Sequence, residues 1–334
     1  MALKEKFKST GTWRQLVQWG FFLWILFIGV QFGLFVRHFE TGGATPLYLR
    51  PPGVEGFLPI GALTSLKYWV ATGVFDPVHP AALVLFLTFV AMSLLAKKSF
   101  CSWLCPVGTL SEALWKLGQS LFGRNFAIWN WLDIPLRGLK YLLLLFFAKI
   151  ILLDMPARAL AGFLRAPYWA ISDVKMLHFF TGMSLTTIIV LAVLAVLSLL
   201  YKNFWCRYLC PYGALLGLVS MLSPMKIRRD SATCTGCLRC SRACPSRLPV
   251  HRKASLSSPE CTGCLTCVEA CPERSLAMAP PFWKRPLPRW VFPVLVLGIY
   301  AGGVAAGMLG GHWESSLTYQ DYQRLIPMAQ YLGH

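Results

Sequence analysis

Acidic residues are scarce in this chain of 334 residues, because 14 Asp and Glu stand against 32 Lys and Arg for a net charge of +18. Charged residues of either sign make up only 14% of the sequence, whereas 56% of the residues are hydrophobic. A soluble domain of this length is less apolar. The long apolar runs also argue against nucleic acid as the reason for the basic excess. Since Lys and Arg collect at the cytoplasmic ends of membrane helices, we expect an α-helical integral membrane protein.

The sequence also has no lone cysteine and no C-x-x-C-H motif. Without that motif, covalent c-type haem attachment is excluded. All 12 cysteines stand in pairs or clusters with metal-type spacing. The first apolar run is long and lacks a small-residue cleavage site, so no cleaved signal is expected.

Eight cysteines form a doubled run between Cys234 and Pro272. Each half reads C-x2-C-x2-C-x3-C-P, the pattern that holds [4Fe–4S] clusters in bacterial two-cluster ferredoxins, where the fourth cysteine crosses to the other cluster. Zinc sites and disulfides explain the doubled pattern poorly, because zinc usually takes two C-x2-C pairs. The predicted ligand sets are Cys234, Cys237, Cys240 and Cys271 for one cluster and Cys261, Cys264, Cys267 and Cys244 for the other.

Five apolar runs, at residues 19–36, 81–96, 136–153, 183–201 and 290–310, are long enough to be membrane spans. Basic residues gather on one side of all five. This bias predicts a multi-pass protein of the inner (cytoplasmic) membrane, with the N-terminus and the cysteine cassette in the cytoplasm and the C-terminus in the periplasm.

We expect three segments along the chain. A four-helix membrane domain would cover residues 1–225, a small α+β two-cluster ferredoxin domain residues 226–280, and a fifth transmembrane helix with a short periplasmic tail residues 281–334. Shorter helices are predicted at 62–72, 109–122 and 158–164, and Thr318 with Asp321 resembles a capping box. Glycines at 298, 302, 303 and 307 would allow the fifth span to pack closely.

Two membrane segments repeat one another, because residues 94–108 align without a gap on residues 199–213. Each copy combines a helix pair, a C-x3-C-P turn and an interfacial apolar segment, and we expect the copies to face each other about an axis along the membrane normal. The thiols that would then converge are those of Cys101, Cys105, Cys206 and Cys210. They could bind a third [4Fe–4S] cluster or another metal, act as two redox dithiols, or be reduced structural cysteines.

Histidines stand at the outer ends of several spans, namely His38, His79 and His178. Each could contact a quinone headgroup, bind haem b, or simply hydrogen-bond a loop carbonyl. Asp76 beside His79 favours quinone, because a carboxylate and an imidazole together can take up the protons of a quinol. The candidate quinone site is therefore His79, Asp76 and His38.

The two C-x3-C-P turns followed by a two-cluster cassette resemble the NapH/NosR-type membrane-bound polyferredoxins, a group that includes YccM-like electron transport proteins. The likeness covers nearly the whole chain and is most specific at residues 97–108 and 202–272. It implies a quinol dehydrogenase or electron conduit, an oxidoreductase subunit that links the quinone pool to a redox partner such as a periplasmic reductase or cytochrome. The 12 cysteines would then be its redox residues. The alternative is an assembly or regulatory factor, such as a CcoG-like metal reductase.

Overall fold

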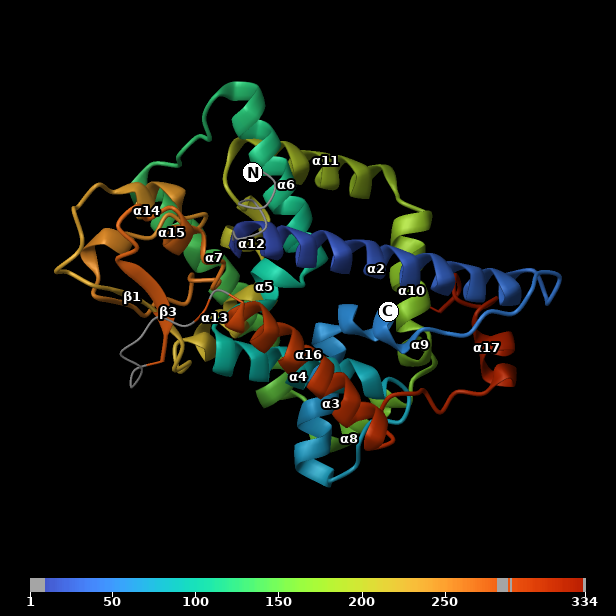
Figure 1. Cartoon of the computed structure of the whole chain (residues 1–334). Helices are drawn as coiled ribbons and strands as arrows, with labels where there is room; N and C mark the ends of the chain where they lie inside the picture. The colour runs from blue at the N-terminus through green and yellow to red at the C-terminus, as the bar shows by residue number, and fades with distance from the viewer. Residues whose placement is uncertain (1–9, 281–287, 289, 333–334) are drawn as a thin grey trace. The chain divides into compact units, whose positions relative to one another are not determined.

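The computed structural model describes residues 10–280, 288 and 290–332. The N-terminal lysines that contribute to the expected orientation, Lys4, Lys6 and Lys8, lie outside these residues. The described chain is mostly helical and contains one small three-stranded sheet (Figure 1). It forms two compact units: unit 1 is Met1–Phe22, Phe89–Leu144 and Leu191–Tyr300, and unit 2 is Leu23–Thr88, Leu145–Val190 and Ala301–His334. This division crosses the three expected segments, since unit 1 holds both the cysteine cassette and the two C-x3-C-P turns.

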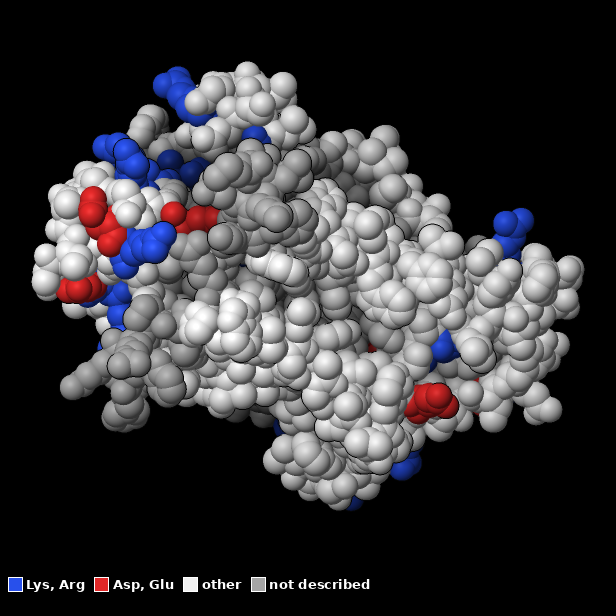
Figure 2. Space-filling view, viewed as in Figure 1, with Lys and Arg blue, Asp and Glu red and all other residues white. Residues whose placement is uncertain are grey.

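Two described helices are long and apolar enough to cross a membrane, α2 (Thr10–Glu40) and α16 (Val291–Leu309). A third candidate is the pair α10 (Ser172–Thr181) and α11 (Leu185–Leu200), which passes the same test together but is bent by 78°. In the face shown in Figure 2, charged side chains gather over α14, α15 and the sheet, whereas the surface over α2 and α16 is almost uncharged.

The remaining expected spans differ from α2 and α16 in length or charge. Helix α4 (Pro80–Ala96) is apolar but has only 17 residues. Helix α7 (Asn130–Ala148) carries Asp133, Arg137 and Lys140 in its first half and continues into the π-helical turn η2 (Lys149–Asp154). The count of five spans therefore stays a prediction.

The short helices predicted from the sequence are confirmed. They are α3 (Pro59–Thr72), α6 (Pro106–Phe122) and α8 (Ala157–Leu164). Thr318 and Asp321 form the expected reciprocal capping box at the start of α17 (Tyr319–Leu325).

The cysteine cassette folds around an antiparallel sheet in the order β2-β1-β3. Its strands are β1 (Lys226–Arg229), β2 (Ser255–Leu256) and β3 (Leu276–Ala279), and its helical turns are α14 (Arg239–Ala243), η3 (Val250–Arg252) and α15 (Thr266–Glu269). Ile227 pairs with Leu256 on one side and Met278 on the other, and all three are buried. These side chains form a small apolar core under the cysteine loops.

Both C-x3-C-P turns have the same local structure in unit 1. The first three residues of each motif lie in a short helix, α5 (Phe100–Trp103) or α12 (Phe204–Tyr208). Cys105 and Cys210 are extended, as a residue before proline prefers. The proline then opens α6 or α13 (Pro211–Ser220) at its first position, where its missing N–H costs nothing.

Unit 2 has an apolar core built from the end of α2, η1 (Pro52–Phe57), α9 (Pro167–Ala170), α10 and α17, with Val36, Ile171 and Ile326 almost fully buried. Within the same unit, α16 packs tightly on α4. A Cβ at Gly303 would lie 2.2 Å from Thr88 and one at Gly307 would lie 2.6 Å from Val84. Two of the four predicted glycines thus serve contacts inside this chain.

Candidate iron–sulfur centres

The eight cassette cysteines surround two separate cavities. Cavity I, about 350 Å³, is lined by Cys234, Cys237, Cys240 and Cys271. Cavity II, about 330 Å³, is lined by Cys244, Cys261, Cys264 and Cys267. Each cavity therefore receives three thiols from one half of the cassette and one from the other, which is the grouping that the crossed ferredoxin pattern requires.

The surroundings of these thiols suit bound iron–sulfur clusters. Burial raises the pKa of the Cys244 thiol to about 12, although the backbone N–H groups of Leu248 and Ser246 oppose that rise. At Cys261 burial also raises the pKa, and the N–H of Gly263 opposes it. Amide donors aimed at sulfur stabilise the thiolate that a metal requires. No three His, Cys, Asp or Glu side chains in the described part of the chain are close enough to share a single ion.

The four C-x3-C-P cysteines come together in unit 1, and we call them the twin-motif centre. Burial raises the pKa of Cys101 to about 11 and that of Cys105 to about 12, and the charge of Cys210 adds to both. Burial raises the pKa of Cys206 as well, followed by the charges of Cys210, Cys105 and Cys101. These mutual effects place the four thiols within electrostatic reach of one another.

The N–H groups three residues after Cys105 and Cys210 face the corresponding sulfur atoms. Gly213 N–H donates to Cys210 Sγ at 3.2 Å, and Gly108 N–H has the same role at Cys105. A Cβ at Gly108 would lie 2.2 Å from the carbonyl oxygen of Cys101, so the turn requires glycine there. The twin-motif centre therefore shares the amide-to-sulfur arrangement of the cassette.

Lys98 lies among these thiols, a role that the sequence reasoning missed because the residue stands at the charged end of an apolar run. Its side chain is only 3% exposed. Burial lowers the pKa of Lys98, but the charges of Cys101, Glu260, Cys210 and Cys206 together outweigh it and raise the pKa. A buried ammonium here offsets the negative charge that metal-bound thiolates carry.

Both turns donate hydrogen bonds to the loops that line cavity II. Ser102 Oγ donates to the carbonyl oxygen of Thr262 at 2.7 Å, and Trp103 Nε1 donates to that of Gly263 at 3.2 Å. In the second copy, Arg207 Nη1 donates to the carbonyl oxygen of Ser246 at 2.7 Å. Ser102 and Arg207 occupy equivalent positions in the two motifs. Both copies of the repeated motif are thus hydrogen-bonded to the loops that line cavity II.

A buried ion pair adds a further connection at the same place. Lys140 Nζ donates to both carboxylate oxygens of Glu260, at 2.6 and 2.7 Å, and Tyr141 donates to Glu260 at 3.0 Å. Glu260 directly precedes Cys261, a residue of cavity II, and its charge also reaches Lys98 of the twin-motif centre. Glu260 therefore electrostatically couples the two groups of cysteines.

The candidate quinone residues lie in unit 2 and are only partly brought together. His79 is fully buried, and its Nδ1 lies 3.2 Å from Glu55 Oε1 while its Nε2 lies 2.7 Å from the carbonyl oxygen of Trp169. The carboxylate partner of His79 is therefore Glu55 and not Asp76, because the chain folds back to bring η1 to the start of α4. Asp76 instead accepts hydrogen bonds from Ser65 and the Trp169 indole, both at 2.9 Å.

His38 does not share the hydrogen-bond partners of His79 and Asp76. Its ring nitrogens contact Tyr319 and the carbonyl oxygen of Thr45. Unit 2 also contains a cavity of about 910 Å³, which we call the outer cavity. Its walls are largely apolar. The charged residues that line it are Asp76, Arg165, Asp321 and Arg324.

The sulfur geometry, the cassette fold and the long apolar helices define a ferredoxin-type iron–sulfur protein with membrane helices. A family described as a 4Fe-4S binding domain matches residues 78–125 and again 183–230, so the same family matches both C-x3-C-P copies. A family described as a 4Fe-4S dicluster domain matches residues 226–272.

Among curated proteins, the chain is 47% identical to the "Putative electron transport protein YccM" of Escherichia coli K12, over 98% of this chain and 93% of that relative. It is 27% identical to the ferredoxin-type protein NapH of E. coli, over 74% of this chain and 83% of NapH. The regulatory protein NosR of Pseudomonas aeruginosa is 30% identical over 47% of this chain and 22% of NosR. The chain belongs to the YccM family of ferredoxin-type iron–sulfur electron transport proteins. No solved structure matches it.

Proposed function

We propose that this protein carries electrons between the quinone pool, the two cassette clusters and a redox partner through a third [4Fe–4S] cluster at the twin-motif centre. The observation that carries the proposal is the set of hydrogen bonds from Ser102, Trp103 and Arg207 to the loops of cavity II. Electron transfer needs short, rigid spacing between centres. These bonds hold the thiols of the twin-motif centre in a fixed position relative to the thiols of cavity II. The order of transfer would be twin-motif centre, cavity II, cavity I.

In this scheme the clusters supply the one-electron chemistry, and the 12 cysteines hold them. Cys234, Cys237, Cys240 and Cys271 would hold the cluster of cavity I. Cys237 is exposed, so this cluster would be the one to exchange electrons with a redox partner. Cys244, Cys261, Cys264 and Cys267 would hold the cluster of cavity II. The proposed location is the inner membrane, with a multi-pass topology, a cytoplasmic cassette and a periplasmic tail.

The quinone headgroup would bind in the outer cavity beside Asp76. The walls are apolar enough for a quinone ring, and Arg165 and Arg324 supply donors for its carbonyl oxygens. His79 and Glu55 are fully paired with each other and with neighbouring groups. They would therefore position the loop that carries Asp76, and Asp76 would be the residue nearest the ring.

The test uses the purified full-length protein with a soluble quinol, followed by absorbance and EPR spectroscopy. We expect about twelve irons per chain, at four per cube, and reduction of the clusters by quinol. Cys206→Ser should lower the iron content to about eight and abolish reduction by quinol, while the two cassette signals remain after chemical reduction. Wild-type clusters that quinol leaves oxidised, but that pass electrons to added metal ions after dithionite has reduced them, would instead support an assembly or regulatory function.

A further inference from the structure

Unit 1 contains a third concave region beside the two cysteine cavities, and Leu248 lines both this region and cavity II. The third region has a volume of about 930 Å³, and we call it the basic pocket. Four cations line it, and no Asp or Glu is among its lining residues. The cations are Arg124, Lys202, Arg242 and Arg247. A site of this composition has a strong positive potential and lacks a counter-ion of its own.

Contacts with aromatic rings fix two of these cations without neutralising them. Arg124 lies 5.3 Å from the ring centroid of Phe126, and Lys202 lies 5.0 Å from that of Trp115. Burial lowers the pKa of Lys202, and the charge of Arg247 lowers it further, while the charge of Cys244 partly opposes both. Held like charges of this kind favour a bound anion, because the anion relieves their repulsion.

An exposed apolar strip runs along helix α6 towards the basic pocket. Leu110, Leu117 and Leu121 recur at helical spacing and are 49%, 51% and 66% exposed. The opposite face of α6 is buried, since Gly108, Glu112 and Trp115 are buried there. The helix ends at Phe122, and the next two residues, Gly123 and Arg124, line the pocket.

We propose that the basic pocket is a binding site for the phosphate headgroup of an anionic phospholipid whose acyl chains lie along the leucine strip of α6. A cationic concavity beside an exposed apolar strip matches the two parts of such a lipid. A soluble acidic redox protein would need the charge but not the strip. It would also find an exposed cysteine elsewhere, at Cys237 of cavity I.

The experiment compares full-length wild type with the double variant Arg124→Gln/Arg242→Gln. Both side chains are exposed, so folding should not change. The matched control is Arg252→Gln/Lys253→Gln, which removes the same charge from exposed positions that do not line the pocket. Delipidated protein is titrated with cardiolipin, phosphatidylglycerol or phosphatidylcholine in nanodiscs, and with inorganic phosphate alone. Retained lipid is measured by native mass spectrometry.

We expect wild type and control to bind the anionic lipids in preference to phosphatidylcholine, and the double variant to bind them roughly thirtyfold more weakly. Inorganic phosphate should bind far more weakly than either anionic lipid, because it cannot use the leucine strip. Equal binding by the double variant, equal binding of phosphatidylcholine, or tight binding of phosphate alone would each overturn the proposal. So would a double variant with normal lipid binding but slowed electron exchange with an acidic redox protein. The cluster absorbance serves as the folding control throughout.

Discussion

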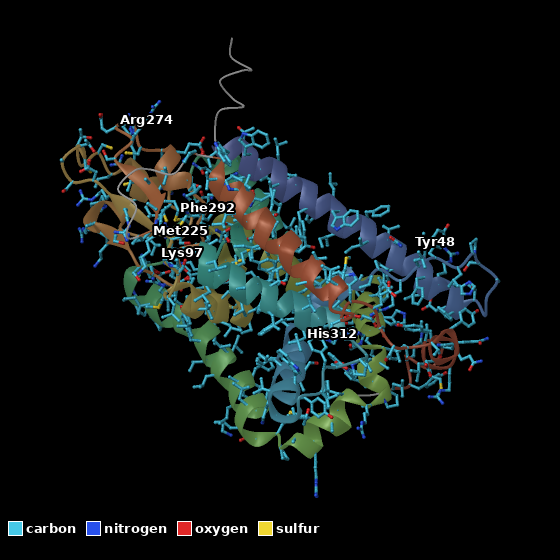
Figure 3. All side chains as sticks on the ribbon, turned by 60° about the horizontal axis from the view of Figure 1, so that its bottom comes forward. Tyr48, Lys97, Met225, Arg274, Phe292 and His312 are labelled. Atoms are coloured by element: carbon cyan, nitrogen blue, oxygen red, sulfur yellow. The ribbon has the colours of Figure 1, made fainter. Side chains whose placement is uncertain are left out.

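Both units bury charged side chains, but they balance the charges differently. In unit 2, Arg50 binds Asp173 at 2.6 Å and Glu55 at 2.8 Å, and His79 shares Glu55. Two cations there face two carboxylates. In unit 1, Lys98 lies among thiols, and the Nζ of Lys97 is buried without a hydrogen-bond partner among the described residues. Figure 3 shows Lys97 near Phe292 at the start of α16.

This difference indicates what each unit requires in order to be complete. Unit 2 balances its buried charges within one group of side chains, which we call the outer cluster: Arg50, Asp173, Glu55 and His79. It therefore needs no added group to stabilise it. Two buried cations of unit 1 face cysteines instead, because Lys97 lies next to Cys261 and Lys98 lies next to Cys101. They are balanced when the thiols are ionised and bound to iron. We therefore expect unit 1, and not unit 2, to depend on its cofactors for stability.

Among the variants that test this difference between the units, Arg50→Met in unit 2 has the largest expected effect. It leaves Glu55 and Asp173 buried near a single imidazole, and breaking one partner of a buried ion pair costs about 3–5 kcal/mol. We expect low yield and a lower unfolding temperature, with the iron content of the folded fraction unchanged. Lys149→Met is the control, because the exposed Lys149–Asp154 pair is worth about 0–1 kcal/mol. Loss of iron from folded Arg50→Met protein would show that the two units are not independent.

Gly108→Ala should break the twin-motif centre in unit 1. The new Cβ would meet the carbonyl oxygen of Cys101 at 2.2 Å, and overpacking of this kind costs about 1–3 kcal/mol. We expect a loss of about four irons per chain, the content of one cube. At the equivalent Gly213 the nearest atom is Cys210 Sγ at 3.4 Å, so Gly213→Ala should keep its iron. Equal iron in both variants would argue against a cluster at this place.

The cysteine spacing is sufficient to predict how the cassette thiols group, because the ligands of each loop are only a few residues apart and the crossing follows from the repeated strand and helix order. The extended cysteine and the helix-opening proline follow from the local rules for proline. The match of Lys97–Gly108 with Lys202–Gly213 predicts that both copies form the same turn, and they do.

Contacts between distant segments could not be predicted in this way. Proximity in sequence made Asp76 the expected partner of His79, whereas the fold supplies Glu55 from η1. The motif spacing gives no partner for Arg207, whereas in the fold Asp133 on α7 holds it at 3.0 Å and it donates to Ser246. Lys98 could not be distinguished from Lys97, because both stand at the end of the same apolar run. Each of these roles depends on tertiary packing, which hydropathy and spacing do not encode.

The two adjacent lysines allow the charge balance of unit 1 to be measured centre by centre. Lys98→Met should lower the midpoint potential of the twin-motif centre, because removing a nearby cation disfavours the added electron. A tenfold change in the equilibrium corresponds to about 59 mV for a one-electron couple, and we expect a shift of that order. Lys97→Met should shift the cavity II cluster instead, since Lys97 faces Cys261. EPR-monitored redox titration distinguishes the two, and identical shifts in both variants would contradict the assignment. Lys98→Arg keeps the charge and should restore the potential.

The smallest effect concerns pH and the outer cluster of unit 2. Burial lowers the pKa of His79, but the hydrogen bond and charge of Glu55, followed by the charge of Asp173, outweigh burial and the opposing charge of Arg50. The folded pKa is therefore raised above the ordinary value of 6.5. A raised pKa contributes stability that is fully present below about pH 6.5 and is lost as the pH rises through the folded value.

Thermal unfolding of the purified protein should show this decline in stability on the alkaline side, and His79→Gln should flatten it. The metal-bound thiols of unit 1 do not titrate in this range, so the iron content should stay constant across the same window. A decline that persists unchanged in His79→Gln would assign the pH dependence to unit 1 and remove the distinction between the two charge clusters.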